Sequence, residues 1–270
     1  MARSAFVIGS APLPRSPLPG ASEHTRTEKT TLTEKAYDGL RQDIVTGALA
    51  PGQPLRMALL AQRYDMGFSP LREALNRLQA ERLVISVALR GFSVAPLSIG
   101  EMWDATEARI LIESQALRLS IRHGDDAWEA EIVGCLHALV LQATRAVSRP
   151  EKARALEQRH YAFHRALVAA CGSAWLLEFF ARLYLESERY RHPVLVPRST
   201  GTSPKTPPEA TQRDLQGEHD ALAKAALTRD ADLACTLLAE HYRRTAKHVE
   251  GLLAGEDMKT GSQQHDEPMR

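Results

Sequence analysis

The chain has 270 residues, of which 44% are hydrophobic and 25% charged, and its formal net charge is +1 at pH 7. No run approaches about 18 uncharged apolar residues, so we expect neither a spanning helix nor a membrane partner. A net charge near zero argues against a protein that coats nucleic acid without specificity. The odd number of cysteines (Cys135, Cys171 and Cys235) disfavours a disulfide scaffold and suits a cytoplasmic protein.

The charge is unevenly distributed along the chain. Residues 31–97 carry 8 basic and 6 acidic side chains, whereas residues 98–270 carry 22 basic and 25 acidic ones. Residues 1–30 are rich in proline and poor in candidate core residues, which is typical of a disordered tail. The polar stretch 253–270 predicts a second disordered tail. A mildly basic module therefore precedes a mildly acidic one.

Residues 31–97 alternate short helical patterns with a final hairpin signal. Three-to-four spacing of apolar residues predicts helices over 31–46, 57–64 and 69–81, and alternation predicts strands over 83–86 and 92–95. Pro70 directly after Ser69 is a helix start signal. Helix, helix, turn, helix and hairpin is the order of a winged helix-turn-helix domain.

That order makes the helix over 69–81 a candidate recognition helix, because the first turn of such a helix reaches base edges in the major groove. Arg72 and Asn76 lie one turn apart, away from the apolar stripe. The alternative is a solvated helix face without a ligand. The candidate DNA-contacting residues are Lys35, Arg41, Arg56, Ser69, Arg72, Asn76, Arg77, Arg90 and Gly91.

Residues 98–252 are almost continuously helical in pattern. Helices are predicted over 101–122, 126–148, 151–171, 174–191, 212–228 and 230–253. Ser98 is placed to cap the first of these helices and Asp230 the last. Residues 197–210 are rich in proline and predict a loop between helices. The fold class that follows is mainly α, with a winged helix-turn-helix before an all-α antiparallel bundle.

Histidines are the candidate metal ligands of the bundle. His160 and His164 are four residues apart on one predicted helix face, and His219 and His241 lie on two later helices. Four converging imidazoles suit a divalent transition metal such as Zn²⁺ or Ni²⁺. The alternative is four separate surface or core histidines. A metal-dependent hydrolase is disfavoured, because no glutamate follows His160 to activate water.

The front module resembles the DNA-binding domain of the GntR family of bacterial transcription regulators. The resemblance rests on LRQDI, GALAPGQPL, PLREALNRL and RGFSVA, which together span nearly all of residues 31–97. Family members usually have Ser-Arg-Thr before the proline, where this chain has Gly67, Phe68 and Ser69. The resemblance therefore implies DNA binding with an operator that differs from the family norm.

The rear module resembles the FCD ligand-binding domain of the FadR subfamily, an antiparallel helical bundle with a central pocket. The matching segments are EARILIES, HYAFHRALVAACGSAWLL and GEHDALAKAALTRDADLACTLLAEHY. The resemblance implies that Arg109, with Glu113 one turn later, belongs to the effector site, and that the four histidines hold the metal. Many members have aspartate where this chain has His160. An internal salt bridge between Arg109 and Glu113 is the alternative.

PLRMALLAQRYDMGFSPLREAL and CGSAWLL further resemble the carbon-starvation-induced regulator branch of the family, which responds to glutarate. The resemblance implies a homodimeric repressor that is not an enzyme and that leaves a palindromic operator when a short dicarboxylate binds. Arginine can grip one carboxylate in bidentate fashion while a metal accepts another, which agrees with such an effector. A regulator whose signal is the metal itself is the alternative.

Overall fold

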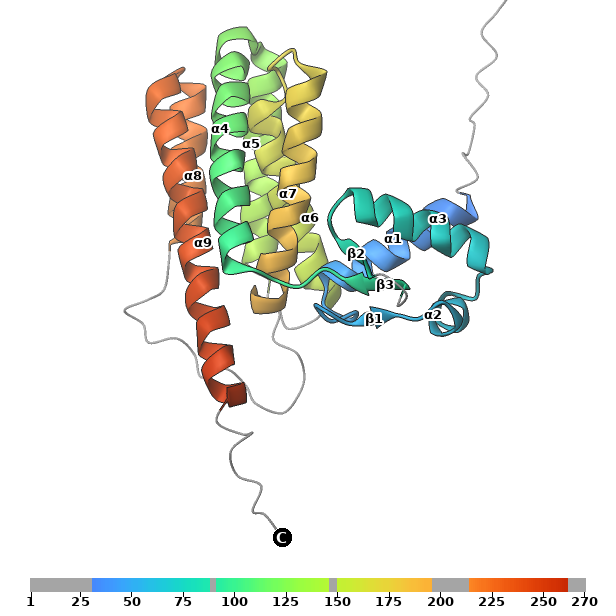
Figure 1. Ribbon diagram of the computed structural model, residues 1–270. Coiled ribbons are helices and arrows are strands. Elements are labelled where there is room, and N and C mark those ends of the chain that lie inside the picture. The colour runs from blue at the N-terminus through green and yellow to red at the C-terminus, as the bar shows by residue number, and fades with distance from the viewer. Residues whose placement is uncertain (1–30, 88–90, 146–149, 196–213, 262–270) are drawn as a thin grey trace, which may run out of the picture. The chain divides into compact units, whose positions relative to one another are not determined.

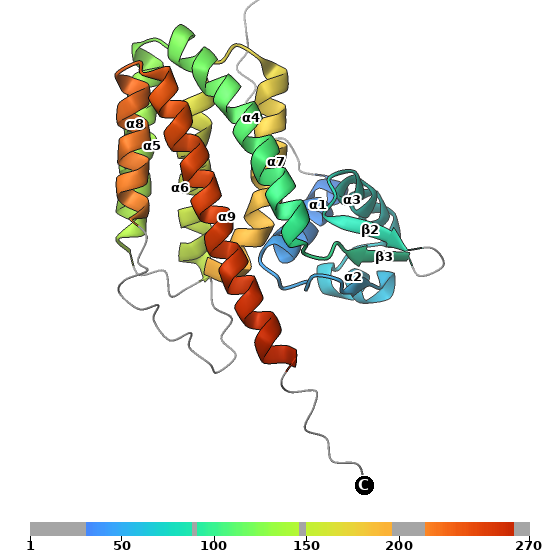
Figure 2. The same cartoon turned by 60° about the vertical axis from the view of Figure 1, so that its left-hand side comes forward.

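The computed structural model of the chain describes residues 31–87, 91–145, 150–195 and 214–261. Within these ranges helices dominate, and the strands form one small sheet. The predicted fold class is confirmed: a winged helix-turn-helix is followed by an all-α set of helices (Figures 1 and 2). None of the described helices combines the length and the apolar character needed to cross a membrane.

The front module contains three helices and three strands. In chain order they are α1 (Leu32–Val45), β1 (Pro54–Leu55), α2 (Met57–Tyr64), α3 (Phe68–Ala80), β2 (Val84–Val87) and β3 (Gly91–Val94). The sheet is antiparallel with the order β1-β3-β2, and Val84 pairs with Val94. The sequence did not predict β1, because two residues are too few to show an alternating pattern.

The apolar stripe of α3 fixes which of its faces meets solvent. Leu71, Leu75 and Leu78 are fully buried in a cluster that includes Leu40 of α1. Arg72 lies on the opposite, exposed side. The helix begins after Gly67, whose backbone is extended, rather than after Ser69 as predicted, so Pro70 occupies the third helical position. The first turn therefore consists of Phe68, Ser69, Pro70 and the buried Leu71, and Arg72 follows it.

Six helices follow in the rear part. They are α4 (Ile99–His123), α5 (Asp126–Ala143), α6 (Pro150–Val168), α7 (Ala174–Leu195), α8 (Leu215–Leu227) and α9 (Ala231–Gly261). Ser98 caps α4 by accepting a hydrogen bond from the Glu101 backbone N–H, and Asp230 caps α9 in the same way. Helix α5 ends before the predicted residue 148, and α9 continues past the predicted residue 252.

These helices pack side by side around a common core. Helix α4 contacts α7 and α9, α5 packs on α6, and α8 packs on α9 (Figure 2). The core includes Leu117, Ile132, Phe163 and Phe180, none of which is accessible to solvent. Because α4, α6, α8 and α9 all contribute to one core, side chains from distant parts of the sequence meet inside it.

Helix α7 also contacts the winged helix-turn-helix. The buried Arg189 guanidinium donates hydrogen bonds to the backbone carbonyls of Arg82, Ala95 and Pro96 at 3.2, 3.1 and 2.6 Å. Leu185, one turn earlier, is buried in the core of the front module. A movement of α7 would therefore pull on the backbone carbonyls of the front module that Arg189 binds.

Candidate functional site

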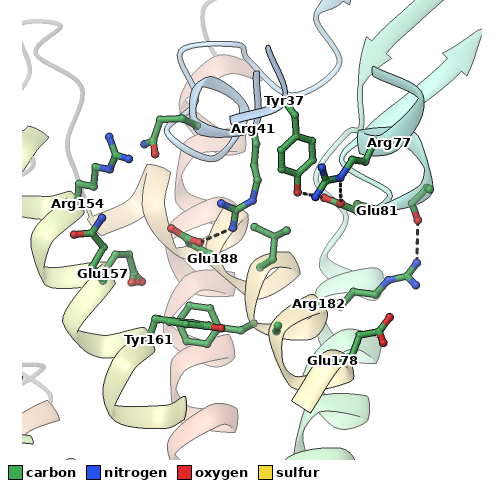
Figure 3. A pocket seen from close by; sticks show the side chains of 16 residues that line it. Tyr37, Arg41, Arg77, Glu81, Arg154, Glu157, Tyr161, Glu178, Arg182 and Glu188 are labelled. Atoms are coloured by element: carbon green, nitrogen blue, oxygen red, sulfur yellow. Dashed lines mark hydrogen bonds and ion pairs between the residues drawn. The ribbon is translucent and has the colours of Figure 1, made fainter. Parts of the chain in front are cut away.

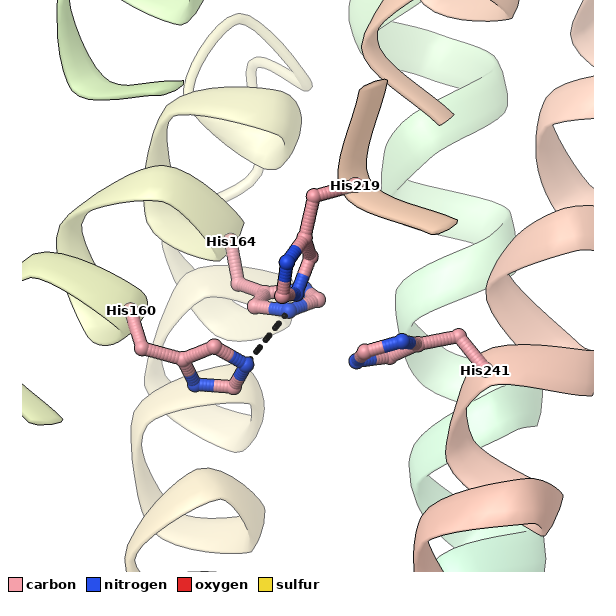
Figure 4. A group of neighbouring side chains, drawn as sticks. All are labelled: His160, His164, His219 and His241. Atoms are coloured by element: carbon pink, nitrogen blue, oxygen red, sulfur yellow. Dashed lines mark hydrogen bonds between the residues drawn. The ribbon is translucent and has the colours of Figure 1, made fainter. Parts of the chain in front are cut away.

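Four histidines from α6, α8 and α9 converge inside the bundle (Figure 4). One ring nitrogen from each of His160, His164, His219 and His241 lies within 4.8 Å of the others. The Nε2 atoms of His160 and His164 are 3.2 Å apart. The predicted convergence thus exists, although the four residues span more than 80 positions of sequence.

Neighbouring oxygen atoms hold the far side of three of these rings. Nδ1 of His160 lies 2.7 Å from the Tyr184 hydroxyl, and Nδ1 of His164 lies 3.0 Å from the Tyr242 hydroxyl. Nδ1 of His241 is 2.8 Å from a carboxylate oxygen of Glu218. Partners of this kind fix ring orientation at metal sites and direct the other nitrogen toward the ion.

The electrostatic environment keeps at least two of the rings neutral. Burial, followed by the charges of neighbouring histidines and arginines, lowers the pKa of His160 and of His164 well below the ordinary value. A neutral imidazole is the form that binds a metal ion. These two side chains can therefore act as ligands at neutral pH without first losing a proton.

The donor set fits a divalent transition ion. Imidazole nitrogens bind such ions at about 2.1 Å, so two ligands of one ion lie at most about 4.2 Å apart. The 4.8 Å spread of the cluster needs a contraction of only about half an ångström. Nitrogen ligands favour zinc, nickel or copper over calcium or magnesium, which prefer oxygen.

A small hollow lies between α4, α7 and α9, close to the histidine cluster. Its volume is about 30 Å³, which leaves room for about two water molecules. Arg109 and Arg191 line it together with hydroxyl and apolar groups, among them Met102, Thr106, Ser187, Tyr242, Thr245 and Val249. Tyr242 faces the hollow and also contacts His164, so it links the hollow to the histidine cluster.

The internal salt bridge that was the alternative for Arg109 is present. Nε of Arg109 lies 2.5 Å from Oε1 of Glu113, and the two side chains are only 3% and 1% exposed. Arg109 also donates to the Tyr242 hydroxyl at 3.0 Å, and that hydroxyl donates to Glu113. Glu113 does not line the hollow. Its carboxylate contacts Arg109 and Tyr242 instead.

The first turns of α3 form a second, exposed hollow. Its lining residues are Phe68, Ser69, Arg72, Glu73 and Asn76, and its volume is about 470 Å³. Arg72 and Asn76 thus share one open surface at the helix start, as their spacing predicts. Of the other candidates, Lys35, Arg56 and Gly91 are exposed, and Arg90 lies outside the described residues.

Arg41 and Arg77 lie in a different place, a cleft between the front module and helices α6 and α7 (Figure 3). The Arg77 guanidinium lies 3.8 Å from the ring centre of Tyr37 and 3.6 Å from a carboxylate oxygen of Glu81. Arg41 approaches Glu188 of α7 at 3.9 Å. These two arginines are therefore engaged within the protein, apart from the surface around Arg72.

Residues 32–94 match the bacterial regulatory proteins of the gntR family, and residues 104–244 match the FCD domain. The chain belongs to the GntR family. Its FCD domain spans more than half of the 270 residues. This GntR protein is a transcriptional regulator that binds DNA and is not an enzyme. The families and relatives that it matches are transcriptional regulators as well.

Two relatives align with most of this GntR regulator. The uncharacterized HTH-type transcriptional regulator BphR of Paraburkholderia xenovorans (strain LB400) is 39% identical over 81% of the chain and 85% of the relative. The HTH-type transcriptional repressor GlaR of Escherichia coli (strain K12) is 37% identical over 81% and 96%. Among solved structures, McbR/YncC of E. coli superposes with a TM-score of 0.64 at 21% identity, covering 82% and 98% of the two chains, which supports the fold alone.

Several residues around the GntR regulator's histidine cluster were not predicted from sequence. Tyr184, Tyr242 and Glu218 contact the clustered histidines, and Arg191 lines the hollow. Glu218 directly precedes His219 and Tyr242 directly follows His241, so proximity in sequence was an available signal for these two. Nothing in the local pattern marks Tyr184 or Arg191, because α7 reaches the site only through tertiary packing.

Proposed function

We propose that this GntR regulator is a homodimeric, metal-dependent repressor whose effector is a short dicarboxylate such as glutarate. The relative GlaR carries the name of a repressor and aligns over 96% of its length, which supports repression. The single observation that carries the effector half is the placement of two buried arginines beside four converging histidines. The DNA-binding role and the effector-binding role each have support in the described side chains.

DNA recognition rests on the exposed first turns of α3. Ser69, Arg72 and Asn76 line one open surface, while the leucines behind them anchor the helix. Arginine pairs with guanine and asparagine with adenine through two hydrogen bonds each in the major groove. Lys35, Arg56 and Gly91 are exposed, and they are candidates for contacts with the DNA backbone. Two copies would contact the two half-sites of a palindromic operator.

The metal would be held by His160, His164, His219 and His241, with Zn²⁺ or Ni²⁺ as the favoured ions. When bound, it supplies a positive charge and an open coordination position for a ligand carboxylate. The Tyr184, Tyr242 and Glu218 side chains would keep the rings oriented in the presence and absence of the ion.

The hollow of about 30 Å³ is too small for a dicarboxylate, so the ligand must bind a more open arrangement. A ligand shifts a two-state equilibrium only if it binds one state more tightly than the other. Helices α4, α7 and α9 surround the hollow, and Arg189 of α7 holds three carbonyl groups of the front module. Opening at α7 would thereby change the placement of the DNA-binding helices.

A calorimetric titration tests the effector half. Protein loaded with zinc is titrated with C4 to C6 dicarboxylates, and the same protein treated with chelator serves as the control. We expect one site per protomer with a dissociation constant that rises at least about tenfold when zinc is removed, because one charge-assisted contact is lost. Equal affinity with and without zinc would contradict the role of the metal, and absence of binding would contradict the effector class.

A further inference from the structure

Arg191 of α7 is a buried arginine that the sequence pattern did not single out. Its side chain is only 6% exposed. One terminal nitrogen, Nη2, donates to both carboxylate oxygens of Glu157 on α6, at 2.8 and 3.4 Å. The Nε–H group has no hydrogen-bond partner among the described residues. A buried N–H without an acceptor is costly, so a position like this one marks a place where an acceptor is missing.

The missing acceptor has a place to bind. Arg191 lines the same hollow as Arg109, and both guanidinium carbons lie 4.9 Å from the centre of the Tyr184 ring. The hydroxyl of Tyr184 in turn contacts His160 of the histidine cluster. Two cations therefore line one small space, and Tyr242, which also lines it, links it to the histidine cluster.

The charges of this site are balanced only while no metal is bound. Glu113 pairs with Arg109, and Glu157 pairs with Arg191, so each guanidinium has one carboxylate. Neutral imidazoles add no charge to cancel that of a divalent ion, and the carboxylate of Glu218, which contacts His241, is shared with Arg244. A ligand with two carboxylates would cancel it, whereas a ligand with one would leave an excess positive charge in a buried place.

We propose that Arg191 anchors the second carboxylate of the effector and makes the site select dicarboxylates over monocarboxylates of the same length. One ligand carboxylate lies near the histidine cluster and Arg109, and the other accepts the Nε–H of Arg191. Arginine presents its donors as a planar fork, so a carboxylate that takes Nε competes with Glu157 for the same guanidinium. This inference rests on the proposed function.

The experiment compares glutarate with pentanoate, which has the same chain length and one carboxylate fewer. Calorimetric titrations are performed on the zinc-loaded full chain for the wild type, Arg191→Gln and Glu157→Gln. We expect Arg191→Gln to weaken glutarate binding about 10- to 100-fold and pentanoate binding less than about threefold. Glu157→Gln, which removes the competitor for Arg191 at nearly constant shape, is expected to leave glutarate binding unchanged or tighter.

The two variants separate ligand binding from a structural role. If Arg191 served only to join α7 to α6 through Glu157, both variants would weaken glutarate and pentanoate alike, and that result would overturn the inference. If Arg191→Gln does not fold, Glu157→Gln still decides: weaker glutarate binding contradicts the inference, and unchanged or tighter binding supports it. A wild type that binds no carboxylate overturns the proposed function itself, whereas selectivity for glutarate that persists in Arg191→Gln overturns only the inference.

Discussion

Replacing Arg72 by alanine is expected to weaken binding to the operator by about 100-fold or more while the protein stays folded. A bidentate arginine–guanine pair contributes about 1–3 kcal/mol of discrimination, and a dimer would lose two such pairs. Arg72 is exposed and lines the open surface of α3, so its removal leaves the leucine core behind that helix intact. Fluorescence anisotropy with a labelled duplex from the upstream region of the regulator's own gene measures the change.

Two further variants give this measurement its controls. Gln79 is exposed on the same helix but does not line the surface around Arg72, so Gln79→Ala should change operator affinity by less than about twofold. Arg72→Lys keeps the charge without the planar fork and should retain binding to unrelated DNA while losing preference for the operator. Operator affinity of Arg72→Ala equal to that of the wild type would show that α3 does not recognise the operator through this residue.

Replacing His164 and His219 together by glutamine is expected to remove the metal and the response to glutarate, with operator affinity within about threefold of the wild type. Glutamine has a similar size but is a poor ligand for a transition ion, and two of four ligands would be lost. Elemental analysis of purified protein should then fall from about one zinc per protomer to below about one tenth. The DNA-binding surface shares no side chain with the histidine cluster, so the two functions should separate.

His137→Gln is the matched control, because His137 is an exposed histidine of α5 outside the cluster. Its metal content and its glutarate response should equal those of the wild type. A double variant that retains a full equivalent of zinc would place the ion elsewhere in the protein. Wild-type protein that binds neither Zn²⁺ nor Ni²⁺ after incubation would rule out the metal centre.

The sequence predicted the front module in more detail than the rear one, for a physical reason. Helix, turn and strand signals there are local: the leucine spacing of α3 and the alternation of β2 and β3 need no distant partner. The strand β1 was missed because it is defined by pairing with β3 rather than by its own two residues. The start of α3 was displaced because the extended backbone of Gly67, not a side-chain cap at Ser69, ends the preceding turn.

The candidate site shows the same division between local and tertiary signals. His160 and His164 share a helix face by spacing alone, whereas their convergence with the other two candidates, His219 and His241, depends on how α6, α8 and α9 pack. Arg191 could not be found in this way, since it reaches the hollow only because α7 packs against α4. For Arg109, local spacing already allowed the pair with Glu113, while its position beside the hollow depends on the packing of α9.

Operator affinity with and without glutarate tests the central claim most directly. The duplex is titrated with zinc-loaded wild type in the presence and absence of saturating glutarate, and both titrations are repeated after chelation. We predict that glutarate weakens operator binding at least about tenfold with zinc and has no effect after chelation, because the ligand must bind the operator-incompetent state more tightly. Operator affinity that ignores glutarate, or that responds to zinc alone, would contradict a repressor released by a dicarboxylate at a metal centre.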